Sequence, residues 1–424
     1  MKPIAKTKSL NNCRRINEIP TSAYIHIPFC RRRCYYCDFA VSVVGDRKDG
    51  SNFSPIQQYI ELLCEEIRHQ PVFDRSLKTV FFGGGTPSLL SVSQLEQILT
   101  TLDRQLGIAA DAEISIEMDP GTFDTAKLNG FMAAGVNRVS LGVQAFQDRL
   151  LTACGRSHNV ADIFQAVDCL AQSGVNNFSL DLISGLPHQN LEHWQQSIDA
   201  VLEIEPNHVS IYDLIVEPVT AFGRYYQPGV APLPPEEMTA QMYRLAQQTL
   251  TQAGYNHYEI SNYAKSGYQC HHNLVYWHNS SYYGLGMGAA SYLLGTRFTR
   301  ARTTQKYYQW VQSNPSPTQG TEPLTEIDIL LETLMLGLRL AEGVNLTQLS
   351  QQFGDATLEA ILASLAPYQQ QGWVKVTSSP SAAHTTPGIR IQLTDPEGFL
   401  FSNTILAALF AKMMNQEPDE GHIE

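Results

Sequence analysis

The feature that most limits the fold is a regular alternation, over the first half of the chain, of short apolar runs with helix-length amphipathic segments. Six apolar runs have the composition of strands: 22–28, 78–83, 113–118, 137–143, 177–183 and 208–214. Helical patterns lie between them, at 55–69, 91–106, 124–134, 160–173 and 190–203. Apolar strands separated by amphipathic helices predict parallel βαβ units whose sheet is buried on both faces. Since a closed barrel of this type has about eight units, the sequence predicts an α/β fold with a partial (β/α)6 barrel.

Local signals support the helix boundaries. Ser91 precedes one helical run and Gln94 follows three residues later, which is the spacing of a capping box. Gly135 and Gly174 each follow a helical run, where a C-terminal glycine is expected.

Polar and glycine-rich motifs follow the predicted strands. The motif FCRRRC comes after the first strand and GGGTP after the second. Glu117 and Asp119 lie at the end of the third strand, Gln144 follows the fourth, and Asp181 lies within the fifth. Because the carboxyl ends of parallel strands meet at one rim of such a barrel, we expect these groups to form one site.

Three cysteines lie within eight residues: Cys30, Cys34 and Cys37, spaced C-x3-C-x2-C. Disulfides need pairs, and structural zinc takes four ligands. A cubane iron–sulfur cluster normally takes four thiolates, so three leave one iron open to a small molecule. The favoured interpretation is a [4Fe–4S] cluster. The alternatives are a zinc ion with a remote fourth ligand, or three unrelated cysteines.

A C-x3-C-x-aromatic-C motif after the first strand resembles the signature of the radical S-adenosylmethionine (SAM) enzymes, with Tyr36 at the aromatic position. In that superfamily the fourth iron binds SAM through its amino and carboxylate groups. The resemblance therefore implies a [4Fe–4S] cluster held by three cysteines, with SAM on the unique iron.

Within the superfamily, the chain is similar to the anaerobic coproporphyrinogen III oxidase family over residues 20–400. That similarity implies the following SAM-binding positions, some of which belong to a second SAM in relatives: Tyr24, Tyr36, Gly84, Gly85, Thr86, Glu117, Gln144, Arg156 and Asp181. From the residues alone, GGGTP is equally a tight turn before Pro87, and a single buried polar group often only satisfies the backbone.

Two functions occur in this family: oxidative decarboxylation of coproporphyrinogen III, and haem transfer by HemW-type chaperones. Phe39 stands where the oxidases typically have a further cysteine, and 23 residues precede Tyr24, fewer than in the oxidases. The sequence HNLVYW, from His272 to Trp277, is similar to the H-N-x-x-Y-W motif of the HemW group. We therefore expect a haem chaperone, with the oxygen-independent oxidase as the alternative.

The HNLVYW motif suggests how haem is bound. A neutral imidazole is a common axial ligand of haem iron, and aromatic rings pack on the macrocycle. The expected haem-binding residues are thus His272, Tyr276 and Trp277. The competing interpretation is a histidine that bonds the backbone in a core of aromatic side chains, and His271, His278 and Cys270 are rival ligands.

Changes of pattern along the chain predict four regions. They are a flexible N-terminus (1–20), the barrel with the cluster and SAM site (21–235), a mixed α+β extension with HNLVYW (236–312), and a winged-helix-like domain (324–424) after a Pro/Ser-rich linker. In the last region we expect helices at 325–341 and 346–365, followed by strands at 373–376 and 389–393.

Charge and composition restrict the partners. The chain has 29 basic and 41 acidic residues, a net charge of −12, which disfavours nucleic-acid binding. No apolar run of about 18 residues occurs, so we expect no transmembrane segment. Peripheral contact with a membrane needs no such run and stays open. With no apolar signal segment and only three clustered cysteines, we expect a reducing cytoplasmic location.

The expected partners are haem-accepting apoproteins and a flavodoxin-like or other electron donor, with the chain as a monomer or homodimer. The basic stretch Arg31 to Arg33 is a candidate contact for such a donor or for a tetrapyrrole carboxylate, or simply solvated charge beside the cluster.

Overall fold

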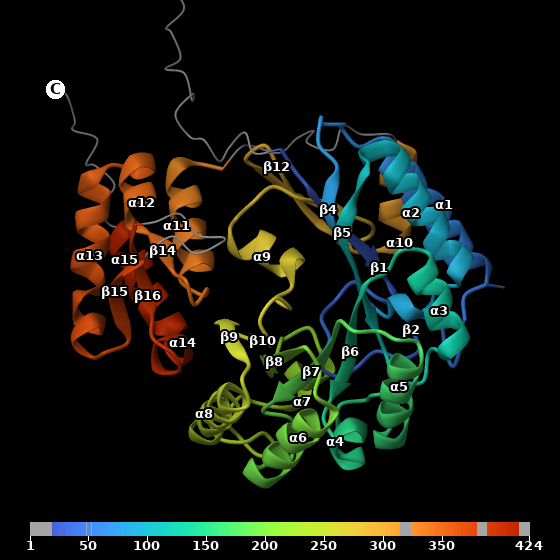
Figure 1. Ribbon diagram of the computed structural model, residues 1–424, viewed down its shortest axis with the longest axis horizontal. Coiled ribbons are helices and arrows are strands. Elements are labelled where there is room, and N and C mark those ends of the chain that lie inside the picture. Colours follow the sequence, from blue (N-terminus) through green and yellow to red (C-terminus); the bar gives the residue numbers. More distant parts are fainter. Residues whose placement is uncertain (1–18, 48, 52, 314–323, 380–387, 415–424) are drawn as a thin grey trace, which may run out of the picture.

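The computed structural model, shown in Figure 1, describes residues 19–47, 49–51, 53–313, 324–379 and 388–414. Most of the predicted flexible N-terminus, nearly all of the predicted linker and the last ten residues of the predicted winged-helix-like domain lie outside these residues.

Six neighbouring parallel strands form the centre of the molecule, as the alternating pattern predicts. They are β1 (Ser22–Ile27), β4 (Leu77–Gly84), β5 (Ile108–Met118), β6 (Arg138–Gln144), β7 (Phe178–Ser184) and β8 (His208–Asp213). Their order in the sheet is their order in the chain. The α/β partial barrel is therefore confirmed. β5 begins five residues before its predicted start, because the strand continues through less apolar residues.

Helices cover the outside of this sheet (Figure 1). They are α1 (Ser54–Arg68), α2 (Val92–Leu106), α3 (Thr125–Ala133), α4 (Asp148–Ala153), α5 (Val160–Gln172) and α6 (Leu191–Ile204). The Ser91–Gln94 capping box is present at the start of α2. Gly135 and Gly174 follow α3 and α5 with φ of +115° and +68°, conformations that favour glycine.

The segment after the barrel extends the sheet at both edges. β10 (Asn262–Ala264) pairs antiparallel with β8, and β9 (Asn256–Glu259) pairs with β10. At the other edge, β11 (Tyr283–Leu285) pairs in parallel with β1. The helix α9 (His271–Trp277), which carries HNLVYW, connects β10 to β11 and so passes between the two edges (Figure 1). The extension therefore lengthens the sheet from six strands to nine.

The remaining elements of this segment surround that sheet. They are α7 (Ala221–Tyr225), α8 (Glu236–Gln252), the antiparallel pair β12 (Ala290–Leu293) and β13 (Thr296–Thr299), and α10 (Thr304–Gln312).

The C-terminal elements have a hydrophobic core of their own, at the left in Figure 1. They are α11 (Glu326–Gly337), β14 (Val344–Asn345), α12 (Leu346–Phe353), α13 (Asp355–Gln370), β15 (Val374–Ser379), β16 (Gly388–Leu393), α14 (Glu397–Leu400) and α15 (Ser402–Met414). Helices followed by an antiparallel strand pair give the winged-helix-like arrangement that the sequence predicts. The single helix expected at 346–365 is wrong: Gly354, with φ +85°, separates α12 from α13.

None of the described helices has both the length and the apolar character needed to cross a lipid bilayer.

Candidate cofactor site

The three clustered cysteines lie on a loop held at both ends. β2 (Phe29–Cys30) and β3 (Ser42–Val43) pair in parallel and fix the ends of the loop, with Cys30 on β2. The Tyr35 N–H donates to the carbonyl of Cys154, at the end of α4, at 2.9 Å, and this bond ties the loop to that helix. All three thiols are half-buried. The loop therefore holds Cys30, Cys34 and Cys37 at the barrel rim.

These cysteines line a cavity of about 480 Å³ at the carboxyl ends of the strands. Eleven of the twelve predicted cluster and SAM residues line it: Cys30, Cys34, Cys37, Tyr36, Gly84, Gly85, Thr86, Glu117, Gln144, Arg156 and Asp181. The structure therefore brings together residues from the first five parallel strands and their loops, as the position of the motifs after the strands predicts.

Three thiols from one loop are suited to an iron–sulfur cluster. Among the described residues, no three His, Cys, Asp or Glu side chains converge on one metal position. A cubane would give each of three irons its own thiolate, which matches the three cysteines of the loop. Burial raises the pKa of the Cys30 and Cys37 thiols, so metal binding must release their protons.

Arg156 connects the cysteine loop to the strand ends. Its guanidinium lies 3.4 Å from Cys34 Sγ and donates to the Tyr36 hydroxyl at 3.4 Å. It also forms an ion pair with Asp119 at 2.5 Å and donates to the Gly142 carbonyl. A buried guanidinium beside the thiols provides positive charge next to an anionic thiolate cluster. Arg156 is thus a positioning residue for the loop.

Asp119 follows Glu117 by two positions, and the sequence places both at the end of the third strand, but Asp119 is not among the predicted SAM-binding positions. Its carboxylate accepts from Arg156 and, at 3.2 Å, from the Thr86 hydroxyl. It lines the same cavity. The sequence SIEMDPGT predicts both carboxylates at one strand end, and the structure adds that Asp119 is the partner of Arg156.

The GGGTP segment is packed against the protein itself. A Cβ on Gly85 would lie 2.7 Å from the Phe29 carbonyl oxygen, so a larger residue cannot replace it without moving the backbone. The Gly84 N–H donates to Glu117, the Gly85 N–H to the Ile27 carbonyl, and the Thr86 N–H to the Phe29 carbonyl. Because these donors are used internally, the groups left to meet a ligand are carbonyl oxygens, which accept from an amino group.

Two half-buried carboxyl groups face the cavity. Burial, together with the nearby Asp181, raises the pKa of Glu117 to about 8. Burial also raises the pKa of Asp181, although hydrogen bonds from Ser140 and Ser179 oppose the shift. Two carboxyl groups whose charge is disfavoured form a site that gains from a cationic ligand.

A strand irregularity positions Gln144. The register of β6 against β7 shifts between Gly142 and Gln144, and Gln144 has φ +71°, which is rare for a residue with a side chain. A non-glycine residue in this conformation is characteristic of a functional site. The bulge places Gln144 at the cavity instead of continuing the ladder.

Tyr24 lies apart from the other predicted SAM residues. It lines a separate chamber of about 190 Å³ within the barrel, together with His272 and Tyr276. Glu117 and Asp181 line both spaces, so the chamber adjoins the cofactor cavity. The Tyr24 hydroxyl lies 3.0 Å from His26 Nδ1, and burial raises its pKa, so it stays protonated.

His272 is buried completely and both of its ring nitrogens have partners. Nδ1 lies 2.8 Å from the Thr79 hydroxyl and Nε2 lies 2.8 Å from the Tyr276 hydroxyl. The ring stacks on Phe81 at 5.2 Å. Burial lowers the pKa of His272 to about 3, so the imidazole is neutral.

Glu113 fixes the start of α9. Its carboxylate accepts from the backbone N–H groups of His271 and His272 at 3.2 and 3.0 Å. In this conformation the motif is therefore a structural connection between α9 and the barrel interior.

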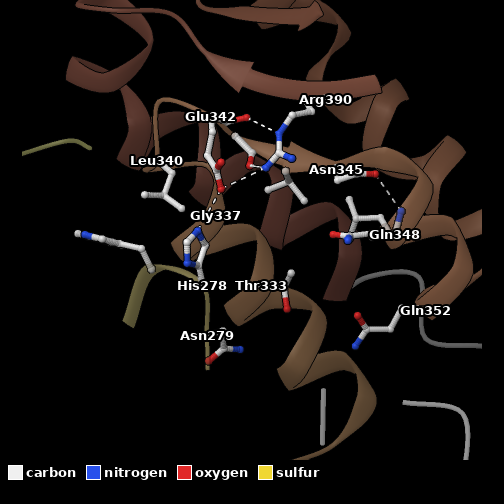
Figure 2. Close-up of a pocket in the computed structure, with 14 residues that line it drawn as sticks. His278, Asn279, Thr333, Gly337, Leu340, Glu342, Asn345, Gln348, Gln352 and Arg390 are labelled. Atoms are coloured by element: carbon white, nitrogen blue, oxygen red, sulfur yellow. Dashed lines mark hydrogen bonds and ion pairs between the residues drawn. The ribbon is translucent and has the colours of Figure 1, made fainter. Parts of the chain in front are cut away.

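The far end of α9 contacts the C-terminal domain. Trp277 and His278 line a small cavity there together with Glu342 and Arg390, and Figure 2 shows His278 beside Glu342. His278 Nε2 lies 3.0 Å from Glu342, which also pairs with Arg390 at 3.2 Å. The three predicted haem residues are thus divided between two different spaces.

Comparison with known proteins agrees with this geometry. Residues 24–201 match the Radical SAM superfamily, and residues 324–379 match the HemN C-terminal domain. The chain is 49% identical over 409 residues to a protein named heme chaperone HemW from Synechocystis, covering 93% of this chain and 97% of that one. The chain belongs to the HemW family of radical SAM proteins.

Other relatives agree with this family membership. A heme chaperone HemW from Bacillus subtilis is 35% identical over 402 residues, covering 92% of this chain and all of that one. Among solved structures, coproporphyrinogen III oxidase (HemN) from Escherichia coli superimposes with a TM-score of 0.75 at 25% identity, over 93% of this chain and 91% of that chain. Membership of the radical SAM superfamily implies a [4Fe–4S] cluster and SAM.

Proposed function

We propose that this protein is a haem chaperone that holds a [4Fe–4S] cluster and SAM, binds haem, and transfers it to apoproteins. The observation that carries the proposal is the near-complete match, at 49% identity, to a relative named as a heme chaperone. The cofactor cavity is compatible with it, since the cysteine loop and the SAM positions meet at one rim.

We assign Cys30, Cys34 and Cys37 as the cluster ligands. When bound, a [4Fe–4S] cluster with SAM on its open iron can deliver one electron to the sulfonium. Glu117 and Asp181 attract the cationic part of SAM, and the GGGTP carbonyls accept from its amino group. Tyr36, Thr86 and Gln144 supply further polar contacts, and Tyr24 lines the adjoining chamber.

The assignment of His272, Tyr276 and Trp277 to haem stays a prediction. It requires that His272 first give up one of its hydrogen bonds. Haem iron needs a ring nitrogen with an available lone pair. His272 provides one only if it leaves the Tyr276 or Thr79 hydroxyl and the barrel interior, which requires a movement of α9.

The four-region division, at 1–20, 21–235, 236–312 and 324–424, also stays a proposal. We further propose a cytoplasmic location and an electron donor of the flavodoxin type.

The second candidate is coproporphyrinogen III oxidation, because the HemN structure shares nearly the whole fold. The test is anaerobic incubation of cluster-loaded protein with SAM, a reductant and coproporphyrinogen III, beside a separate haem titration. A chaperone binds haem stoichiometrically and forms no protoporphyrinogen IX. Formation of protoporphyrinogen IX, with 5′-deoxyadenosine and carbon dioxide, would refute the chaperone assignment.

A further inference from the structure

Several large apolar side chains lie exposed at the mouth of the cofactor cavity. Phe39 is 54% exposed, Ile215 69% and Val219 71%. Phe39 belongs to the cysteine loop, and the other two follow β8. Exposed apolar side chains that gather at the edge of a cavity indicate a surface that a ligand covers.

These residues border a second, open cavity of about 510 Å³ that is continuous with the first. Arg33, Asp38, Phe39, Val41 and Glu217 line both spaces. We call the surface formed by Phe39, Val41, Ile215, Val219, Arg33 and Arg302 the rim shelf. A ligand lying on it would face the cofactor cavity.

The two walls of the rim shelf are held together by the protein. The Phe222 N–H, just after Val219, donates to the Tyr35 carbonyl of the cysteine loop at 3.0 Å. The rings of Tyr35 and Phe222 meet edge to face at 6.2 Å. The shelf is thus largely preformed, which lowers the entropic cost of binding.

Two guanidinium groups lie at this apolar surface. Arg33 donates to the carbonyls of Cys37 and Val41 at 3.2 and 3.3 Å, which uses two of its five N–H donors. The Arg302 side chain is 60% exposed; it donates to the Asp38 carbonyl and lies 3.9 Å from the Asp38 carboxylate. Such an exposed, long ion pair is weak and leaves Arg302 able to bind another carboxylate.

The acidic groups of the shelf restrict how an anionic ligand can lie. The charge of Asp38 is offset by its ion pair with Arg302, whereas Glu217, on the wall that follows β8, would repel a ligand carboxylate. The carboxylates of a ligand are therefore favoured on the side of Arg33 and Arg302, with its apolar part toward Ile215 and Val219.

We propose that the rim shelf is the haem-binding surface, with the porphyrin plane on Phe39, Ile215 and Val219 and the two propionates at Arg33 and Arg302. The inference rests on the proposed haem-chaperone function. Haem is a flat apolar ring with two carboxylates on one edge, which matches the composition of the shelf. SAM, a cation, matches it poorly.

The test is titration of cluster-loaded, full-length protein with ferric protoporphyrin IX, followed by difference absorbance in the Soret region. The variants are Ile215→Asp combined with Val219→Asp, and Arg302→Glu. The matched controls are Val72→Asp and Arg75→Glu, exposed residues before β4 at the opposite end of the barrel. Iron content and thermal unfolding of each variant check that the fold and cluster are intact.

We expect the shelf variants to raise the haem Kd at least ten-fold and the controls to leave it unchanged. Haem dimethyl ester, which lacks the free propionates, should bind the wild type at least ten-fold more weakly than haem, but should not distinguish wild type from Arg302→Glu. Equal haem affinity in wild type and shelf variants would overturn the rim shelf while leaving the chaperone function intact. Failure of the wild type itself to bind haem would instead refute the proposed function.

Discussion

The barrel rim and the helix α9 carry the two motifs that distinguish this chain, yet their surroundings differ. At the rim, half-buried thiols and polar groups line a large open cavity. In α9, His272 is fully buried and its side-chain hydrogen bonds are satisfied. A motif residue with unused ligand-binding capacity beside a cavity is ready to bind, whereas one with satisfied bonds in a core stabilises the fold. In this conformation HNLVYW therefore holds α9 to the barrel interior, beside the chamber that His272 and Tyr276 line.

The largest effect expected at the rim is that of Cys34→Ser. A hydroxyl is a poor ligand for iron compared with a thiolate, and the cluster has only three protein ligands. We expect nearly complete loss of the cluster, measured as iron and sulfide content and as absorbance near 400 nm. Cys169→Ser, at a buried cysteine on α5, is the matched control and should retain the cluster. Equal iron content in both variants would remove Cys34 from the ligand set.

At α9 the expected effect of His272→Ala is on stability. The change removes two buried hydrogen bonds and a stacked ring, which should cost about 2–4 kcal/mol of unfolding free energy. Denaturant unfolding at neutral pH measures it, and the cluster content should stay normal. His271→Ala is the control, since the neighbouring side chain is 66% exposed. If His272→Ala is as stable as His271→Ala but loses haem, His272 is a haem ligand and does not stabilise the fold.

The sequence predicted the rim better than it predicted α9, and the reason is physical. Rim residues such as Glu117 and Gln144 follow strands, and parallel topology brings strand ends together wherever the helices pack. For His272 the sequence shows only a residue type. Its role depends on Thr79, Phe81 and Tyr276 meeting it in space, and on α9 crossing between the edges of the sheet.

The exposed side chains of the rim were also missed from the sequence. Nothing in the residues around Ile215 or Val219 indicates that they remain exposed, because apolar residues after a strand are normally packed. The role of Asp119 was missed for a different reason: its partner Arg156 lies 37 positions away in the chain.

The rim also predicts a pH dependence that α9 does not share. The pKa of Glu117 is about 8, so below pH 8 the carboxyl is mostly protonated in the absence of ligand. The sulfonium of SAM favours the carboxylate, so binding releases a proton and the affinity for SAM rises with pH up to about 8. The dissociation constant of SAM is expected to fall by close to ten-fold per pH unit between pH 6 and 7.

Equilibrium dialysis of SAM against cluster-loaded protein at pH 6, 7 and 8 measures this slope. Because the amino group of SAM titrates in the same range, Glu117→Gln is the necessary control. The variant should keep only the part of the slope that belongs to SAM. Identical slopes in both proteins would show that Glu117 does not change its protonation on binding.

The smallest effect is expected at the outer end of α9, where His278 meets Glu342 (Figure 2). Their side chains are 42% and 30% exposed, and pairs in contact with solvent contribute little. His278→Ala should lower the unfolding free energy by no more than about 1 kcal/mol in denaturant titrations, less than half the effect of His272→Ala. Both histidines belong to one short segment, so this pair of variants compares a buried histidine with a partly exposed one. If His278→Ala proves the more costly change, the contact of α9 with the C-terminal domain, and not its contact with the barrel interior, holds the helix in place.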